Sequence, residues 1–257
     1  MTYSLKDKVC VITGGNKGIG KAAAKKFSEN GANVVIVARD EVALKETVEE
    51  IRKAGGKCTY NRTDLTDREQ IKNLFNEIRK KFGRIDVLVN NAGGGTFTPS
   101  IKDTTLEEWD YILALNLTSA FLCCKEAMEI MEKQEEGKII NVSSTSGTIA
   151  STPGGVSYRA AKHGLMGLSK VLLKEVEKKG ISVCAIVPSH VKTETYRKGF
   201  ETGTGWTKEK KEIWESAIEP EDIADAILFV ATRDKKVIIP KIAIYPRADI
   251  PKYGMEV

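Results

Sequence analysis

The chain has 257 residues, of which 41% are hydrophobic and 29% charged, fractions that exclude collagen-like and largely disordered proteins. Its net charge of +5 comes from 40 basic and 35 acidic residues that are interspersed. Nothing in this pattern resembles the basic stripe with stacking aromatics that a nucleic-acid partner needs.

Five cysteines and two histidines exclude most disulfide frameworks and metal sites. The cysteine count is odd, and no two cysteines have the C-x-x-C spacing. The chain also lacks a signal sequence and an apolar run of about 18 residues. We therefore expect a cytoplasmic protein with no membrane segment and no metal.

Short apolar runs alternate with amphipathic segments along the chain. The run Val-Val-Ile-Val at 34–37 is typical of a strand covered on both faces, and 41–53 has the spacing of a helix. The expected strands are 9–12, 34–37, 57–60, 85–89, 138–142, 181–187 and 242–245. The expected helices are 18–29, 41–53, 67–81, one or two within 104–132, 157–177 and 220–231.

This alternation predicts an α/β fold, a doubly wound parallel sheet of the Rossmann type with three layers, α/β/α. Neither a Pro/Ser-rich linker nor a tandem repeat divides the chain, so we expect a single domain over 1–257. Residues 193–218 fit least well and are predicted to form a mobile substrate flap at the carboxyl edge of the sheet.

A glycine-rich turn follows the first expected strand, with the sequence Thr-Gly-Gly-Asn-Lys-Gly-Ile-Gly at 13–20. Glycines let a backbone approach a pyrophosphate closely, and the helix that follows offers free N–H groups to the anion. The Gly-Lys-Ser/Thr sequence of a nucleotide-hydrolysing loop is missing. The motif therefore predicts a dinucleotide site.

The end of the second expected strand suggests which dinucleotide binds. An acid that would bind a ribose diol belongs there, but the sequence reads Ala38-Arg39-Asp40. Arg39 and nearby Lys17 favour a 2′-phosphate, hence NADP(H). In the alternative, Arg39 is simply solvated and Asp40 caps the next helix, which leaves NAD(H) open.

Tyr158 and Lys162 are four residues apart on an expected helix, so their side chains share one face. Ser144 comes just after the strand 138–142, and Asn116 lies in a neighbouring helix. With the glycine motif, Asp64-Leu65 and Asn90-Asn91-Ala92-Gly93, these residues closely resemble the short-chain dehydrogenase/reductase family over residues 7 to 231. The nearest type is the 3-oxoacyl-carrier-protein reductase.

The resemblance implies a catalytic set of Asn116, Ser144, Tyr158 and Lys162. Tyr158 would be the general acid in carbonyl reduction, and its pKa would have to fall by about three, or roughly 4 kcal/mol, to match pH 7. The Lys162 ammonium and an oxidised nicotinamide would supply that change. Ser144 would donate to the substrate oxygen, and Asn116 would hold a proton-relaying water.

The resemblance also implies how the cofactor is held, with Asp64 and Leu65 flanking the adenine and Lys162 on the nicotinamide ribose. Val191 and Thr193 match positions that hold the carboxamide. The full cofactor set is Gly14, Asn16, Lys17, Gly18, Ile19, Gly20, Arg39, Asp64, Leu65, Asn91, Ala92, Gly93, Tyr158, Lys162, Val191 and Thr193.

The chain departs from the family pattern in two places. Cys184 and Ser189 replace the usual Asn and Gly around the carboxamide loop, and His190 beside them could touch substrate. The tail carries Pro240, Pro246 and Pro251 instead of a glycine-rich end. Family members are often oligomers, so a homo-oligomer, dimer or tetramer, is expected.

These observations predict an NADP(H)-dependent oxidoreductase that moves hydride between nicotinamide and a ketone or secondary alcohol. Three alternatives stay open: an NAD-dependent alcohol dehydrogenase of the same fold, a non-catalytic redox sensor that binds NADP and a partner, and a nucleic-acid-binding protein. The partner expected first is a small carbonyl or alcohol.

Overall fold

One parallel sheet organises the computed structural model, which describes residues 3–95, 98, 100–148, 155–201 and 206–252. Within these residues seven strands pair in the order β3-β2-β1-β4-β5-β6-β7. The strands are β1 (Val9–Thr13), β2 (Asn33–Ala38), β3 (Lys57–Arg62), β4 (Val87–Asn90), β5 (Gly137–Val142), β6 (Ile181–Pro188) and β7 (Lys241–Ile244). The predicted doubly wound α/β fold is confirmed.

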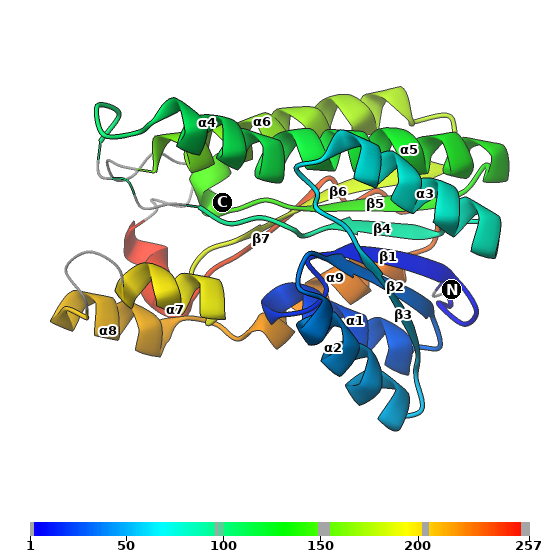
Figure 1. Ribbon diagram of the computed structural model, residues 1–257, viewed down its shortest axis with the longest axis horizontal. Coiled ribbons are helices and arrows are strands. Elements are labelled where there is room, and N and C mark those ends of the chain that lie inside the picture. The colour runs from blue at the N-terminus through cyan, green and yellow to red at the C-terminus, as the bar shows by residue number, and fades with distance from the viewer. Residues whose placement is uncertain (1–2, 96–97, 99, 149–154, 202–205, 253–257) are drawn as a thin grey trace.

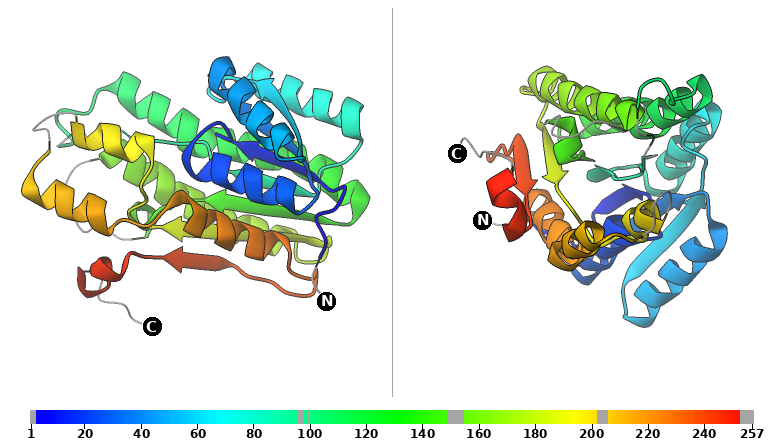
Figure 2. Two further views of the ribbon diagram at one scale, coloured as in Figure 1. Left: turned by 90° about the horizontal axis from the view of Figure 1, so that it is seen from below. Right: turned by 90° about the vertical axis from the view of Figure 1, so that its left-hand side faces the viewer.

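Helices cover both faces of this sheet, and each face has its own hydrophobic core (Figures 1 and 2). Helices α1 (Gly18–Glu29), α2 (Glu41–Lys53) and α9 (Pro220–Ala231) pack around Phe27 on one face. On the other, the helices α3 (Arg68–Phe82), α5 (Ser119–Gln134) and α6 (Val156–Glu175) pack around Phe75, and α4 (Leu106–Leu113) packs against α6. None of the described helices is both long and apolar enough to cross a membrane.

Local sequence signals account for where these helices begin and end. The Asp40 carboxylate accepts the Ala43 N–H at 3.1 Å and caps α2, and the Asp67 carboxylate caps α3 in the same way. Gly83 ends α3 in the left-handed conformation, with φ of 68°. The predicted helices therefore match the observed ones to within a few residues.

The segment predicted as a flap, 193–218, contains helices α7 (Glu194–Glu201) and α8 (Lys208–Ser216). The structure describes 193–201 and 206–218 of it. Both helices lie beyond the carboxyl ends of the central strands (Figure 1). The chain then enters α9 and ends in β7 and a 3-10 turn, η3 (Arg247–Lys252). Pro240 immediately precedes β7, an edge strand, so it interrupts no central pairing.

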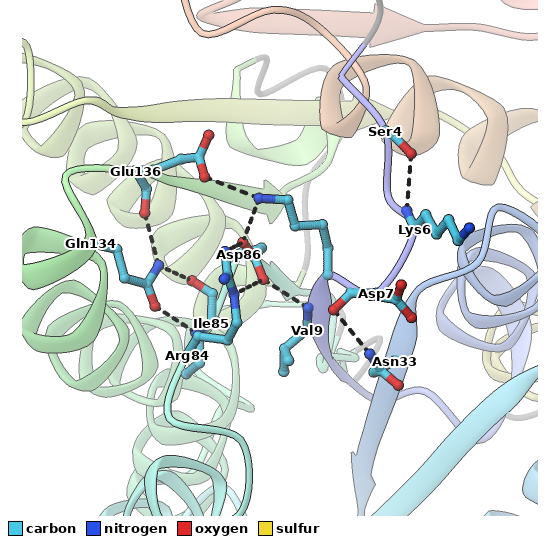
Figure 3. A network of polar contacts seen from close by, with 11 residues as sticks. Ser4, Lys6, Asp7, Val9, Asn33, Arg84, Ile85, Asp86, Gln134 and Glu136 are labelled. Atoms are coloured by element: carbon cyan, nitrogen blue, oxygen red, sulfur yellow. Dashed lines mark hydrogen bonds and ion pairs between the residues drawn. The ribbon is translucent and has the colours of Figure 1, made fainter.

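A buried carboxylate joins β1 and β4 at the amino edge of the sheet (Figure 3). Asp86 is fully buried and accepts the Val9 N–H at 2.8 Å, the Arg84 guanidinium at 2.5 Å and the Lys8 ammonium at 3.2 Å. Burial by itself would raise the pKa of Asp86, but these donors outweigh it, and the pKa is lowered. The ion pairs hold the strand starts in register.

Lys138 is a second buried charge at this edge, with 5% of its surface exposed. Its Nζ donates to the carbonyl of Val230, in the last turn of α9, at 3.3 Å, and to that of Arg233, just beyond the helix. Burial, with a smaller contribution from the Arg233 charge, lowers the pKa of Lys138 to about 8. Folding thus disfavours the charged form of Lys138, while the two carbonyls hold its ammonium in place.

This lowered pKa predicts a stability difference that depends on pH. Between pH 8 and about 10.5 the unfolded chain keeps a proton on Lys138 that the folded chain has lost, so stability rises with pH. We expect the free energy of unfolding of the wild type, relative to Lys138→Met, to rise by about 2 kcal/mol from pH 7 to pH 10. Urea unfolding at each pH measures it, and a constant difference would contradict the prediction.

Candidate active site

The glycine-rich turn leaves the backbone open at the start of α1. Gly14 has φ of 65°, and a Cβ there would lie 3.0 Å from Ala92 Cα, so glycine is required. Lys17 precedes the helix without capping it, and the first turn holds no acidic residue. The first N–H groups and the positive helix end therefore stay available, and the turn fits a pyrophosphate.

Thr13 ties this turn to the end of β4. Its Oγ1 accepts the N–H groups of Asn91 and Ala92, both at 3.0 Å, and the Asn91 amide donates back to the Thr13 carbonyl at 3.0 Å. Two predicted cofactor residues, Asn91 and Ala92, are thereby placed beside Gly14. The sequence analysis assigned Thr13 no role, although the Thr-Gly pair of the motif was the available signal.

Tyr158 and Lys162 lie in the first two turns of α6, at the carboxyl end of β5. Lys162 is 3% exposed, and its Nζ donates to the Val142 carbonyl at 3.0 Å and lies 5.6 Å from the centre of the Tyr158 ring. Two glycines pack against the pair: a Cβ on Gly95 would lie 2.9 Å from Tyr158 Cγ, and one on Gly93 3.3 Å from Lys162 Nζ. The predicted pair is brought together, with Lys162 buried and Tyr158 half-buried.

Ser144 completes this cluster from the turn after β5. Its Oγ accepts the Ser146 N–H at 3.1 Å, and its hydroxyl is hydrogen-bonded to Tyr158. Burial raises the pKa of Tyr158, and the Ser144 contact offsets only part of that rise. The expected lowering of this pKa is therefore not found in the protein alone, which holds Tyr158 as the neutral phenol. Burial also lowers the pKa of Lys162 to about 8.

Asn116 sits in a π-helical turn, η1 (Ala114–Thr118), between α4 and α5, and is 1% exposed. Its amide donates to the carbonyls of Gly94, at 2.8 Å, and Ile112, at 3.0 Å, and its Oδ1 accepts the Gly94 N–H at 3.1 Å. A Cβ on Gly93 would lie 2.6 Å from that oxygen. Asn116 therefore fixes the loop that packs against Lys162 and Tyr158.

Arg39 is held at the tip of β2 by two groups that the sequence analysis did not connect with it. One amino group donates to the Tyr111 hydroxyl at 3.0 Å, and the other lies 3.7 Å from the Asp64 carboxylate. From sequence no carboxylate is expected to bind a ribose diol at the tip of β2, but the neighbouring strand β3 brings Asp64 there. Asp40 is occupied as the cap of α2. Nothing in the sequence pattern signals Tyr111, which lies 72 residues from Arg39.

The other predicted cofactor residues are spread around the glycine turn. Leu65 is 5% exposed and belongs to the core beneath α3, while Ile19 packs on the opposite core. The Asn16 carbonyl accepts the Thr47 hydroxyl at 3.3 Å. Lys17 is exposed, and its charge helps to lower the pKa of Glu194, after the larger contribution of Lys198.

The loop after β6 brings the last two predicted residues to this turn. Val191 is buried and pairs with Ile218, and a Cβ on Gly18 would lie 3.2 Å from the Thr193 methyl. Ser189 and His190 in the same loop both contact Asp249 of η3. Sequence reasoning missed Asp249, because no local pattern links it to a loop 59 residues earlier.

Known proteins are similar to this chain in sequence and in fold. The chain matches the family described as short chain dehydrogenase over residues 8–203. It is 34% identical to a 3-oxoacyl-(acyl-carrier-protein) reductase of Thermotoga maritima, over 93% of this chain and 96% of that protein. It is 39% identical to a D-beta-hydroxybutyrate dehydrogenase of Rhizobium meliloti, over 74% of each chain.

A solved structure supports the same relationship. The crystal structure of a metagenomic short-chain oxidoreductase in complex with NADP superposes with a TM-score of 0.81 at 32% identity, covering 95% of this chain and 98% of that one. The chain therefore belongs to the short-chain dehydrogenase/reductase family, oxidoreductases that act on alcohol or carbonyl groups and typically use a nicotinamide cofactor.

Proposed function

We propose that this chain is an NADP(H)-dependent reductase of ketones, or the dehydrogenase of the corresponding secondary alcohols, with Tyr158 as general acid and base. The observation that carries the proposal is the convergence of Tyr158, Ser144 and buried Lys162 beside glycines 93 and 95. Glycine is required at both positions, because a Cβ would collide with Asn116 at 93 and with the Tyr158 ring at 95, so the loop backbone packs directly against these groups. A redox sensor would have no chemical need for this set.

The residues around the glycine turn would hold the cofactor. The open start of α1 would bind the pyrophosphate, and Lys162 would bind the nicotinamide ribose. When bound, the nicotinamide supplies the hydride. Thr193 and Val191 lie against the same turn and would meet its carboxamide.

Reduction needs one proton on the carbonyl oxygen for the hydride added at its carbon. Ser144 would donate a hydrogen bond to that oxygen, and Tyr158 would transfer its phenolic proton to it, which yields the alcohol and a phenolate. Because burial keeps Tyr158 protonated, the acid is present before the reaction begins. In oxidation the phenolate would take the proton back.

Lys162 would stabilise the phenolate through its charge, since Nζ lies 5.6 Å from the phenol ring and few other charges reach this buried position. Proton return would pass near Asn116, whose side chain lies with Lys162 on either side of Gly93. Asn116 would thereby position a relaying water, as in the expectation from sequence.

For the cofactor's adenine end we infer a preference for the 2′-phosphate. Arg39 is 54% exposed and its fork is already oriented by Tyr111 and Asp64 at the tip of β2. A guanidinium in a fixed position suits a phosphate, whereas Asp64 is partly neutralised by it and Asp40 is used as a cap. Lys17 would add a second positive charge.

The substrate is inferred to be a small carbonyl compound or alcohol, of the type reduced by 3-oxoacyl-thioester reductases. We infer a homo-oligomer as well, because Phe121 on α5 and Val171 on α6 expose 48% and 64% of their surface. Apolar side chains on neighbouring outer helices are suited to contact with a second copy.

A variant without the Tyr158 hydroxyl distinguishes an enzyme from a non-catalytic redox sensor. We expect Tyr158→Phe to lower kcat for NADPH-dependent reduction by about a thousandfold, because the general acid is lost, while NADPH still binds. A screen of ketones provides the substrate, and fluorescence titration measures binding. Tyr60→Phe is the matched control, since its hydroxyl donates to Glu41 of α2 and is not part of the cluster around Tyr158. Unchanged turnover in Tyr158→Phe would sink the proposed role.

The pH profile of the reaction tests Lys162. Its pKa of about 8 means that the ammonium is present below pH 8 and lost above it, whereas the raised pKa of Tyr158 keeps the acid protonated throughout. We expect kcat/KM for reduction to be level from pH 6 to 7 and to fall above pH 8. In Lys162→Met the low residual activity should lose this break; a break that persists there belongs to another group.

Arg39→Ala tests the preference for the phosphate. We expect kcat/KM with NADPH to fall about tenfold or more, the effect of losing a charge-assisted contact, while kcat/KM with NADH changes little. Lys45→Ala removes one charge from the exposed side of α2 and serves as control. Equal losses with both cofactors, or faster wild-type turnover with NADH, would refute the preference.

A further inference from the structure

The carboxyl-terminal turn is attached to the loop after β6 by one buried oxygen atom. Asp249 of η3 is 1% exposed, and its Oδ2 accepts hydrogen bonds from Ser189 Oγ at 2.7 Å and His190 Nδ1 at 2.9 Å. A carboxylate has no proton to donate, so the hydroxyl and the imidazole Nδ1–H are the donors. A single acceptor thus fixes two consecutive residues of this loop.

The same loop is held on its other sides by main-chain bonds. The Ser189 N–H donates to the Ile244 carbonyl at 2.9 Å, and the Ile218 N–H donates to the His190 carbonyl at 3.1 Å. Only the side chains of Ser189 and His190 remain to be oriented, and both point to Asp249. The Ser189 hydroxyl is what makes the first of these contacts available.

The fixed imidazole then contacts α7. The rings of His190 and Tyr196 stack with centroids 5.5 Å apart and an angle of 21° between their planes. The residues just before Tyr196 cover both turns of the candidate site: Thr193 lies against Gly18, and a Cβ on Gly94 would lie 3.6 Å from the Thr195 methyl. Figure 1 shows η3 at the same end of the sheet as α7.

We propose that Asp249 is a positioning residue that holds His190, and through its stacked partner Tyr196 the start of α7, over the mouth of the cofactor site. The carboxyl-terminal segment thereby sets how tightly the site closes on its ligands. Buried polar contacts of this kind are rigid when every donor is satisfied, and both donors here share one acceptor. That this closure affects cofactor binding rests on the proposed function.

Because a single Asp249 oxygen accepts both hydrogen bonds, variants of this residue can separate the loss of the acceptor from the loss of the charge. In Asp249→Asn an amide oxygen can still accept both hydrogen bonds, whereas Asp249→Ala removes the acceptor. Arg247→Ala alters an exposed residue of the same turn and is the control. Ser189→Ala removes one donor only, so it remains informative if Asp249→Ala does not fold.

Two measurements on the full chain test the proposal. For Asp249→Ala we expect faster amide hydrogen exchange in 189–201, with unchanged exchange in β1 and α1, and about a tenfold higher Kd for NADPH. Asp249→Asn and Arg247→Ala should match the wild type, and Ser189→Ala should show a smaller effect in the same segment.

Other results would overturn the positioning role. Wild-type exchange of 189–201 in Asp249→Ala would show that the contact does not hold α7, and an equal loss of protection in Arg247→Ala would show that the effect does not come from the Asp249 carboxylate. Exchange does not depend on turnover, so it is independent of the Tyr158→Phe result. Failure of the proposed function and failure of this proposal are therefore told apart.

Discussion

The site depends on keeping the Lys162 ammonium buried at the carboxyl end of the sheet. Removing a charge from water is costly, and the cost shows as the pKa lowered to about 8. One main-chain carbonyl, that of Val142, receives the ammonium. This placement of the ammonium requires that β5 ends at Val142 and that the first turns of α6 lie beside that strand end. The parallel sheet brings the two together. Glycine at 93 lets the loop backbone approach the ammonium closely.

The pieces of this arrangement that follow from short-range rules could be predicted from sequence. Helix 41–53 was predicted with its actual bounds, because Asp40 caps it and Leu44, Val48 and Ile51 repeat at helical spacing. The glycine turn and the Tyr-Lys spacing are also local, and the structure brings them to one edge. Burial, which a sequence does not show, raises the Tyr158 pKa, and the lowering expected from Lys162 together with an oxidised nicotinamide stays a prediction.

Contacts between distant segments escaped prediction for a different reason. Tyr111 reaches Arg39 only because α4 ends above the tip of β2, and Asp249 reaches His190 only because the tail folds back after β7. Each contact joins two ordinary polar residues, so neither has a distinctive pattern. Asp64 was assigned to the adenine from family resemblance, and its ion pair with Arg39 changes the charge that the 2′-phosphate would meet.

A buried lysine lies where the strands start and another where they end, and both have a pKa of about 8, but their surroundings differ. At the amino edge, Lys138 ends at the carbonyls of α9 and lies 4.9 Å from the centre of the Tyr3 ring, so its surroundings are filled. At the carboxyl edge, Lys162 donates to the Val142 carbonyl and lies near the Tyr158 ring and the backbone of Gly93. A lowered lysine pKa therefore does not by itself mark a site. What distinguishes Lys162 is its place beside the glycine-rich loop at 93–95, together with a phenol whose proton burial retains.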